Sequence, residues 1–567
     1  MEERSSLPRL LLFAVAVFLF VTYGLPAITG KSTKSDVQPL GRADDTTPAV
    51  AARPAEELCT LAGARFQATL TSRGGSLQSY LPADGKYLER QGGHSSDLVT
   101  TTLASRLPLR TDLRLPPAGA GAPEQLAFDD VDWKLESKTA TGCVFRYEDE
   151  STSATKTIAT TERPFELELT LAVTNKAKEA RAHRLTVENA EFYRAADTKS
   201  SWQRQSEYQT QVEVHAGDNM VRWGLEDFEP KDFEDADFSA EKWRVSKGDA
   251  ALVAVSTSYF AKVLVPLEGA KPRGETLVEE IWNRAQFADK DKDPQLGHTY
   301  RARLGYEPRI LAAGETATYR VLSFTGPKER EVLAGIGGGG YPTTEVLNLG
   351  TFGAIGKWLI RYLYFLHGLV ASWGWAICLL TITVKVLLFP LSIAQIKSTV
   401  AMRKLKPEMD AINAKYKDDA QQRGLALQEL WRKNQVANPM LGCLPVLLQM
   451  PVWWALYTSL QTAVELYHTP FGPFVPDLSA PGKYFIIPAM LGVSSFLQQH
   501  LMPMQGDPMQ QRMMKWMMPS MFTVMMLFLP AGLGIYFLTN TWLGILQQVA
   551  VERFYKTQES PSEPTPA

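Results

Sequence analysis

Lys385 is a lone cation in an otherwise apolar stretch at residues 373–391 of the 567-residue chain. A charge at membrane depth is costly unless it faces water or a partner. Thr381 lies four residues earlier, on the same face of a helix. Lys385 is about 9 Å along a helix from Leu391, so its flexible stem can also reach the nearer aqueous surface. Two readings stay open: a lysine that extends to the surface, and a lysine in a polar cavity that receives an acidic group.

The other apolar stretches carry polar side chains but no acidic counter-ion. Glu465 lies only at the outer end of its stretch. An unpaired cation in such surroundings would attract an acidic group of a bound molecule. The polar residues at inner positions are Gln449, Thr458, Ser459, Ser494, Ser495, Tyr536, Thr539 and Asn540.

Sequence signatures of catalysis are missing. The seven histidines are dispersed, and neither His-Glu-x-x-His nor Gly-x-Ser-x-Gly occurs. The glycine run at residues 337–340 is not followed by Lys-Ser/Thr, so we interpret it as a hinge rather than a phosphate loop. We expect a protein without covalent chemistry, metal or cofactor.

Methionines are concentrated in one apolar stretch. Thioether side chains adapt to varied apolar partners, which suits a surface that accepts many sequences. We predict a hydrophobic slide formed by Met517, Met521 and Met525 with Leu456 of a neighbouring stretch. The alternative is that these methionines pack within the protein or face lipid. The whole methionine row is Met513, Met514, Met517, Met518, Met521, Met525 and Met526.

The elements that carry these residues are predicted membrane spans. Residues 1–29 contain an apolar run after Arg4 and Arg9, which is typical of a cleaved signal peptide or a retained anchor. We favour the anchor because Leu25 stands where cleavage requires a small residue. Five further spans make six in all: 373–391, 440–462, 484–501, 513–529 and 533–551, within a core at residues 372–551.

Residues 392–439 carry nine Lys/Arg against five acids, which places this segment on the cytoplasmic side. Helical stretches on both sides of Asp418-Asp419 predict a helical hairpin. Both chain termini are then cytoplasmic, and the large domain lies outside. We predict contact with ribosomal RNA or an acidic factor through Arg403, Lys404, Lys406, Arg432 and Lys433, with a merely solvated loop as the alternative.

Residues 58–330 consist of short alternating runs separated by Gly, Asp, Asn and Pro, which predict a large all-β domain, a sandwich. Residues 30–57 before it are predicted to be a flexible linker. Cys59 and Cys143 of this domain either pair in an oxidising compartment or remain free thiols.

Residues 331–371 follow as the glycine-rich hinge and an amphipathic helix. At 353–371 apolar residues form one helical stripe, and Lys357 and Arg361 lie four apart elsewhere. Such a helix is predicted to lie in the membrane interface. The alternative is an ordinary helix packed on the β domain. Residues 552–567 are a short disordered tail.

Average composition hides these differences. The net charge of -2 and mean hydropathy of -0.14 resemble those of a soluble protein. However, residues before Phe352 have a net charge of -8, and the remainder has +6. The apolar C-terminal part excludes a wholly soluble enzyme, and the charge balance excludes a nucleic-acid binder driven by bulk positive charge, so no DNA partner is expected.

Several long motifs resemble the YidC/Oxa/Alb family of membrane protein insertases, in its bacterial form with a large periplasmic domain. They are NPMLGCLPVLLQMPV at 438–452, DPMQQ at 507–511, WMMP at 516–519 and LPAGLGIY at 529–536. The resemblance is strong over residues 373–552 and weaker over the outer domain.

The resemblance implies a multi-pass protein of the bacterial inner membrane with a periplasmic β-supersandwich. It also implies a groove open to the cytosol and lipid but closed outside. The essential groove arginine of the family falls on Lys385, which keeps the charge but loses the planar fork. The groove threonine matches Thr381, and the paired tyrosines of the last span become Tyr536 and Phe537. A polybasic ribosome-binding tail is missing, so ribosome contact would come from the hairpin.

We therefore expect an insertase and chaperone that works alone or with the Sec translocon on nascent membrane proteins. Client tails would enter a groove formed by Lys385, Thr381, Gln449, Tyr536, Phe537 and Asn540. The alternative is a secondary transporter, although no inverted repeat or acidic ion site is visible. A third interpretation makes the outer domain a sugar-binding or sugar-modifying module.

Overall fold

The computed structural model of the chain forms two compact units, which are described separately. The β unit is Ser32–Asn348, and the helical unit is Leu349–Ala567 together with Met1–Lys31. The predicted anchor at 1–29 and most of the linker at 30–57 lie outside the described residues. The structure describes residues 54–88, 97–101, 106–115, 125–126, 132–198, 210–228, 243–268, 271–281, 286–287, 289–350, 353–417, 419–434, 444–482, 485–501 and 508–558.

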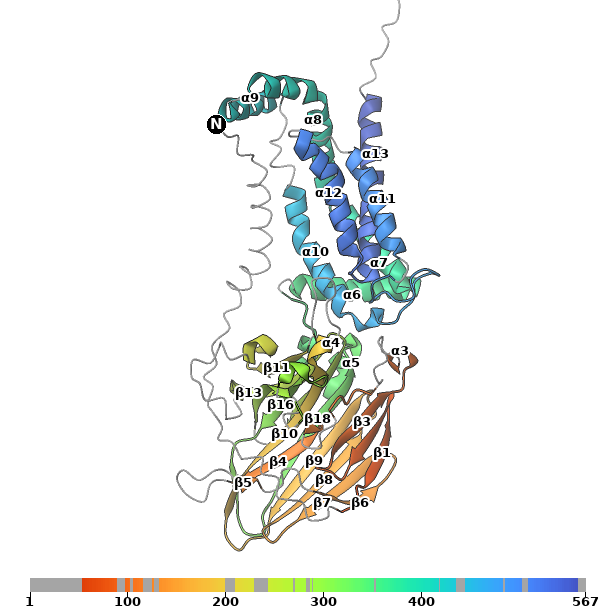
Figure 1. Cartoon of the computed structure of the whole chain (residues 1–567). Coiled ribbons are helices and arrows are strands. Elements are labelled where there is room, and N and C mark those ends of the chain that lie inside the picture. The colour runs from red at the N-terminus through yellow and green to blue at the C-terminus, as the bar shows by residue number, and fades with distance from the viewer. Residues whose placement is uncertain are drawn as a thin grey trace, which may run out of the picture. The chain divides into compact units, whose positions relative to one another are not determined.

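The β unit contains two antiparallel sheets (Figure 1). The smaller sheet has the order β1-β2-β3, with bounds Leu58–Gly63, Phe66–Thr71 and Ser76–Pro82. The larger sheet has 15 strands, with the path β5-β4-β10-β16-β15-β13-β14-β18-β9-β8-β7-β6; β11 pairs with β12 and β13, and β17 pairs with β10. Its strands are β4 (Arg110–Leu115), β5 (Gln125–Leu126), β6 (Lys134–Lys138), β7 (Gly142–Glu148), β8 (Thr152–Thr160), β9 (Glu166–Asn175), β10 (Arg181–Arg194), β11 (Gln211–Ala216), β12 (Asn219–Trp223), β13 (Arg244–Ser256), β14 (Phe260–Glu268), β15 (Arg273–Ile281), β16 (Gly297–Gly305), β17 (Arg309–Leu311) and β18 (Thr316–Pro327).

The larger sheet folds back on itself to form two packed layers. Four strands lie between β10 and β18 in the sheet order, yet His183 Nε2 of β10 is 2.8 Å from the Tyr319 hydroxyl of β18. Lys262 Nζ of β14 likewise donates to the carbonyl of Ala190 in β10 over 3.2 Å. The interior between the layers is apolar because alternate residues of each strand point inward, as in β9. The all-β architecture predicted for this region is confirmed.

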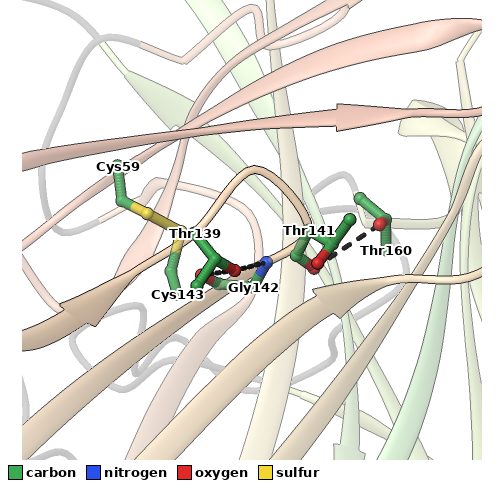
Figure 2. Close-up of a disulfide and its surroundings, with 6 residues drawn as sticks. All are labelled: Cys59, Thr139, Thr141, Gly142, Cys143 and Thr160. Atoms are coloured by element: carbon green, nitrogen blue, oxygen red, sulfur yellow. Dashed lines mark hydrogen bonds between the residues drawn. A yellow bond between two sulfur atoms is a disulfide. The ribbon is translucent and has the colours of Figure 1, made fainter.

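A buried disulfide joins the two sheets. Cys59 of β1 and Cys143 of β7 are bonded, and both side chains are fully buried (Figure 2). Beside Cys143 the chain turns tightly, with the Gly142 amide donating to Thr139 Oγ1 over 2.9 Å. Of the two states that the sequence left open for these cysteines, the structure has the paired one.

Short helical segments follow and interrupt the strands. The glycines at 337–340 all have positive φ, and the Gly337 amide donates to Glu166 Oε1 over 3.1 Å. Positive φ angles favour glycine, which has no Cβ. The hinge role of this run stays a prediction. The segments are α3 (Gly85–Leu88), α4 (Ala195–Thr198), η3 (Leu225–Phe228), η5 (Lys290–Lys292), α5 (Arg330–Gly335), η6 (Ile336–Gly338) and η7 (Pro342–Val346).

The helical unit contains a bundle and a long hairpin (Figure 1). The bundle helices are α6 (Gly353–Val370), α7 (Trp373–Leu387), α10 (Leu444–Thr462), α11 (Ile486–Leu501), α12 (Pro508–Met526) and α13 (Ala531–Gln558), with η9 (Val464–Leu466) after α10. Helices therefore occupy all five segments predicted as C-terminal spans. Judged by length and hydropathy together, none of the helices in the described part of the chain qualifies as a membrane-crossing segment.

The hairpin consists of α8 (Phe389–Lys415) and α9 (Ala420–Lys433). α7 ends at Leu387, before the predicted limit of 391, because Pro390, in the first turn of α8, has no N–H to continue the α7 ladder. The break between α8 and α9 falls where it was predicted. The side chain of Asp419 accepts hydrogen bonds from the amides of Gln421 and Gln422 and so caps α9. A small core of Leu405, Met409 and Leu430 holds the two helices together.

Candidate functional site

Lys385 lies where three helices meet. It is half-buried near the end of α7. A methyl group placed on Gly544 of α13 would lie 3.8 Å from Lys385 Nζ and 3.2 Å from Gln498 Nε2 of α11. Because Gly544 has no side chain, the ammonium group can approach the α13 backbone. The sequence marked Lys385 but not these two neighbours.

The face of α13 beside Lys385 carries further polar groups. Asn540 and Gln547 lie four residues before and three residues after Gly544, which puts all three on one helix face. Asn540 Oδ1 and Gln547 Nε2 are buried and have no hydrogen-bond partner among the described residues. A buried polar atom without a partner costs free energy, so these atoms are available to a bound polar molecule.

No carboxylate of the bundle neutralises Lys385. Helices α7, α10, α11 and α12 contain no acidic residue, and α13 contains only Glu552, two turns beyond Gly544. Within the described residues, Lys385 makes no ion pair or side-chain hydrogen bond. An uncompensated cation in low-dielectric surroundings favours the arrival of an acidic group. The unpaired Lys385 ammonium group thus lies beside Gly544, on the face of α13 that also carries the side-chain amides of Asn540 and Gln547.

The predicted groove residues do not all lie at this opening. Thr381 is buried, and its hydroxyl donates to the Ile377 carbonyl over 2.7 Å. Tyr536 and Phe537 are buried in the bundle core, where the Phe537 ring packs against Phe522 at a centroid distance of 5.0 Å. These three side chains are therefore buried within the bundle. The side chain of Gln449 lies outside the described residues.

The methionine row of α12 forms an exposed apolar surface. Met517, Met521 and Met525 are exposed, and Met521 keeps 63% of its surface accessible to solvent. Leu456 of α10 is only 1% exposed and belongs to the bundle core, so its assignment to the slide is wrong. α10 is apolar on most sides, and its sequence does not show which side packs inward.

The cations of the hairpin are only partly described. Lys404, Arg432 and Lys433 are exposed. The side chains of Arg403 and Lys406 lie outside the described residues. The predicted contacts of this surface stay a prediction.

A folded loop covers one end of the bundle, where the sequence predicted only a connection between two spans. This outer loop, residues 463–482, includes η9 and a bridge between Phe471 and Val475. The amides of Gly532 and Ala531 at the start of α13 donate to the carbonyls of Leu478 and Ala480 in the loop, over 2.8 and 2.9 Å. The Phe471 ring occupies the space that a side chain at Gly374 would fill. Gly374 and Gly532 were the sequence signals of this close packing.

Comparison with known proteins covers both units. Residues 365–559 match the family described as 60Kd inner membrane protein, and residues 60–362 match the family described as YidC periplasmic domain. A protein of Anaeromyxobacter dehalogenans named membrane protein insertase YidC is 32% identical over 524 residues, which cover 89% of this chain and 87% of that protein. A protein of Burkholderia cenocepacia with the same name is 38% identical over 326 residues, which cover 58% of this chain and 55% of that protein.

Among solved structures, a crystal structure of an active YidC insertase is similar over 94% of this chain and 99% of that chain. Its sequence identity is 18%, and the TM-score is 0.37.

Proposed function

The chain belongs to the YidC family of membrane protein insertases, and we propose that it takes up the polar end of a client beside Lys385. It is an inner membrane protein whose β unit is the periplasmic domain. Its substrates are newly made membrane proteins. The observation that carries the proposal is the unpaired Lys385 ammonium group between α7, α11 and α13.

We propose six membrane spans: the N-terminal segment and helices α7, α10, α11, α12 and α13. The excess of Lys and Arg at 392–439 supports a cytoplasmic position for the hairpin, with both termini on that side. Lys385 then lies near the cytoplasmic end of α7, and the outer loop lies on the periplasmic side. A client tail would thus enter from the cytosol, and the outer loop would close the opposite end.

The chemistry of the site is electrostatic and forms no covalent bond. Lys385 offers a positive charge to an acidic tail, and the amides of Asn540 and Gln547 offer hydrogen bonds to uncharged polar groups. These interactions offset part of the cost of moving polar groups out of water. The apolar segment of the client then passes along the exposed methionines of α12 into lipid, where burial of its side chains drives insertion.

The cytoplasmic position proposed for the hairpin also suggests partners other than the client. The exposed hairpin cations Lys404 and Lys433 support contact with the acidic surface of a ribosome. Cooperation with the Sec translocon would supply clients whose periplasmic parts are long.

The test is insertion of purified clients into vesicles that hold the full-length chain. Two clients with the same apolar segment are compared, one with an acidic tail and one with a neutral tail. Lys385→Ala is expected to lower insertion of the acidic client by roughly tenfold or more, because one partner of a desolvated charge pair is lost. Lys385→Arg restores it, and Lys138→Ala, at an exposed site of β6, has no effect. Undiminished insertion of the acidic client by Lys385→Ala, at equal protein level, would refute the role.

A further inference from the structure

α6 has three distinct faces. One face packs into the bundle through Leu359, Leu363 and Leu366, which belong to the same core as α7 and α10. A second face is apolar but exposed: Trp358 is 53% exposed, and Phe365 and Leu369 are 59% and 66% exposed. On a wheel of about 100° per residue, the exposed apolar face lies beside the buried one.

The third face of α6 is cationic. Lys357 and Arg361 are exposed and lie one turn apart, on the side of α6 away from the buried leucines. α6 contains no acidic residue. Neither cation forms an ion pair with any residue that the structure describes. Two neighbouring positive charges therefore remain unneutralised next to an exposed apolar surface.

The exposed aromatic residues of α6 are held in a fixed row. The Tyr362 ring stacks between Trp358 and Phe365, at centroid distances of 5.5 and 6.0 Å. The Tyr362 hydroxyl lies 3.1 Å from Thr383 Oγ1 of α7, which anchors the row to the bundle. A rigid apolar surface of this kind loses little side-chain entropy when it is covered.

The position of α6 suits a membrane interface. Figure 1 shows α6 running crosswise to α7 and α10 at one end of the helical unit. α6 ends at Val370 and α7 begins at Trp373, so this is the end that the outer loop covers. If this end of the bundle lies at the membrane surface, the exposed apolar face of α6 can contact lipid acyl chains. The cationic face, on the side of α6 away from the bundle, then lies near the lipid headgroups.

We propose that α6 is a binding surface for an anionic phospholipid. Lys357 and Arg361 pair with its phosphate, and the guanidinium group supplies paired N–H donors. The acyl chains cover Trp358, Phe365 and Leu369. A zwitterionic lipid would cover the apolar face equally well but would leave net positive charge, so charge complementarity selects the anionic one. The lipid would lie in the outer leaflet of the membrane, and this assignment alone rests on the orientation proposed above.

The test titrates the full-length chain in neutral detergent with phosphatidylglycerol or phosphatidylcholine and counts bound lipids by native mass spectrometry. We expect Lys357→Gln/Arg361→Gln to weaken phosphatidylglycerol binding by about 25-fold, since each of the two cations contributes about 1 kcal/mol near a charged lipid, which is about fivefold. Phosphatidylcholine binding should change less than twofold. Raised salt should reduce the wild-type preference in the same way.

Two further variants separate charge from apolar contact. Lys134→Gln/Lys138→Gln removes the same charge from exposed sites of β6 and should keep the preference. Trp358→Ala/Phe365→Ala should weaken the binding of phosphatidylglycerol and phosphatidylcholine by the same factor. An unchanged preference in Lys357→Gln/Arg361→Gln overturns the proposal, as does equal weakening of both lipids. A second copy of the chain bound in place of lipid, and displaced by the same substitution, would also overturn it.

Discussion

Lys385 Nζ on α7 lies 3.8 Å from the point where the first side-chain carbon would stand at Gly544 on α13. These residues are far apart in the sequence, and the missing side chain at Gly544 keeps the space beside the cation open. This open space gives a reason for a glycine in the middle of α13, where glycine lowers helix stability by about 1 kcal/mol relative to alanine.

Filling this space should impair the site without removing its charge. Gly544→Leu is expected to lower insertion of a client with an acidic tail nearly as much as Lys385→Ala does, because the new side chain occupies the place of the client carboxylate. Gly482→Leu in the outer loop, where no atom lies near a new side-chain carbon, serves as the control. Insertion into vesicles measures the effect. Wild-type insertion by Gly544→Leu would show that the space is not used.

The contact between Gly374 and Phe471 should hold the outer loop against α7. A methyl group on Gly374 would overlap the Phe471 ring. Gly374→Ala is expected to favour loop opening by about 1–3 kcal/mol. The half-buried thiol of Cys378, one turn further along α7, reports opening by its rate of maleimide modification, in a Cys443→Ser background.

Removing the ring tests this explanation. Phe471→Ala/Gly374→Ala relieves the overlap but loses the packing of the ring, so it should open no more than Phe471→Ala alone. Gly368→Ala on α6, where a methyl group meets no neighbour, should leave the rate unchanged. Additive effects of the two substitutions would argue against direct contact.

The Cys59–Cys143 disulfide should stabilise the β unit. It links residues 84 positions apart and thus restricts the unfolded chain. Reduction, or Cys59→Ala/Cys143→Ala, is expected to lower the free energy of unfolding by about 2–5 kcal/mol, as measured by urea unfolding. Cys378→Ala is the control. Labelling of both Cys59 and Cys143 by a thiol reagent in unreduced, denatured protein would show that they are not bonded.

Lys156 should make the stability of the β unit depend on pH. Burial lowers the pKa of Lys156 from 10.5 to about 7, although its Nζ donates to the Leu109 carbonyl over 2.7 Å. Between these pH values the unfolded chain binds a proton that the folded chain does not, so stability rises with pH from about 7 to 10. Lys328, whose pKa burial lowers to about 8, contributes in the same direction above pH 8.

Urea unfolding at pH 7, 8 and 9 measures this dependence. The slope from one such group cannot exceed about 1.4 kcal/mol per pH unit. Lys156→Met should remove the part of the rise that begins near pH 7 and leave the part due to Lys328. Lys138→Met, at an exposed site, should leave the whole profile intact. Equal profiles for Lys156→Met and the wild-type chain would contradict the assignment.

Local patterns predicted most of the secondary structure. Alternating runs over 58–330 predicted strands such as β9, and the long apolar stretches predicted α7 and α10 to α13, although α12 begins before 513 and α13 continues beyond 551. These patterns work because the side-chain periods of strands and helices are properties of the local backbone. The early end of α7 came from Pro390, which divides an apolar stretch into two helices.

The candidate site was predictable only in part. An unpaired lysine in an apolar stretch stands out in any sequence, so Lys385 could be selected as a candidate from the sequence. Leu456 was misplaced because α10 is apolar on most sides, and only packing against neighbouring helices selects the side that is buried. Gln498 and Gly544 were missed because their helices approach α7 from distant parts of the chain.

By itself, the sequence determined the type and approximate position of the elements, the family motifs and the presence of a lone cation, Lys385, in an apolar stretch. The tertiary structure decided which groups surround that charge, that Cys59 and Cys143 are bonded, and that the outer loop fits against Gly374. The division has a physical cause. Periodicity and motif spacing act within a few residues, whereas contacts between distant segments depend on how whole helices and sheets pack.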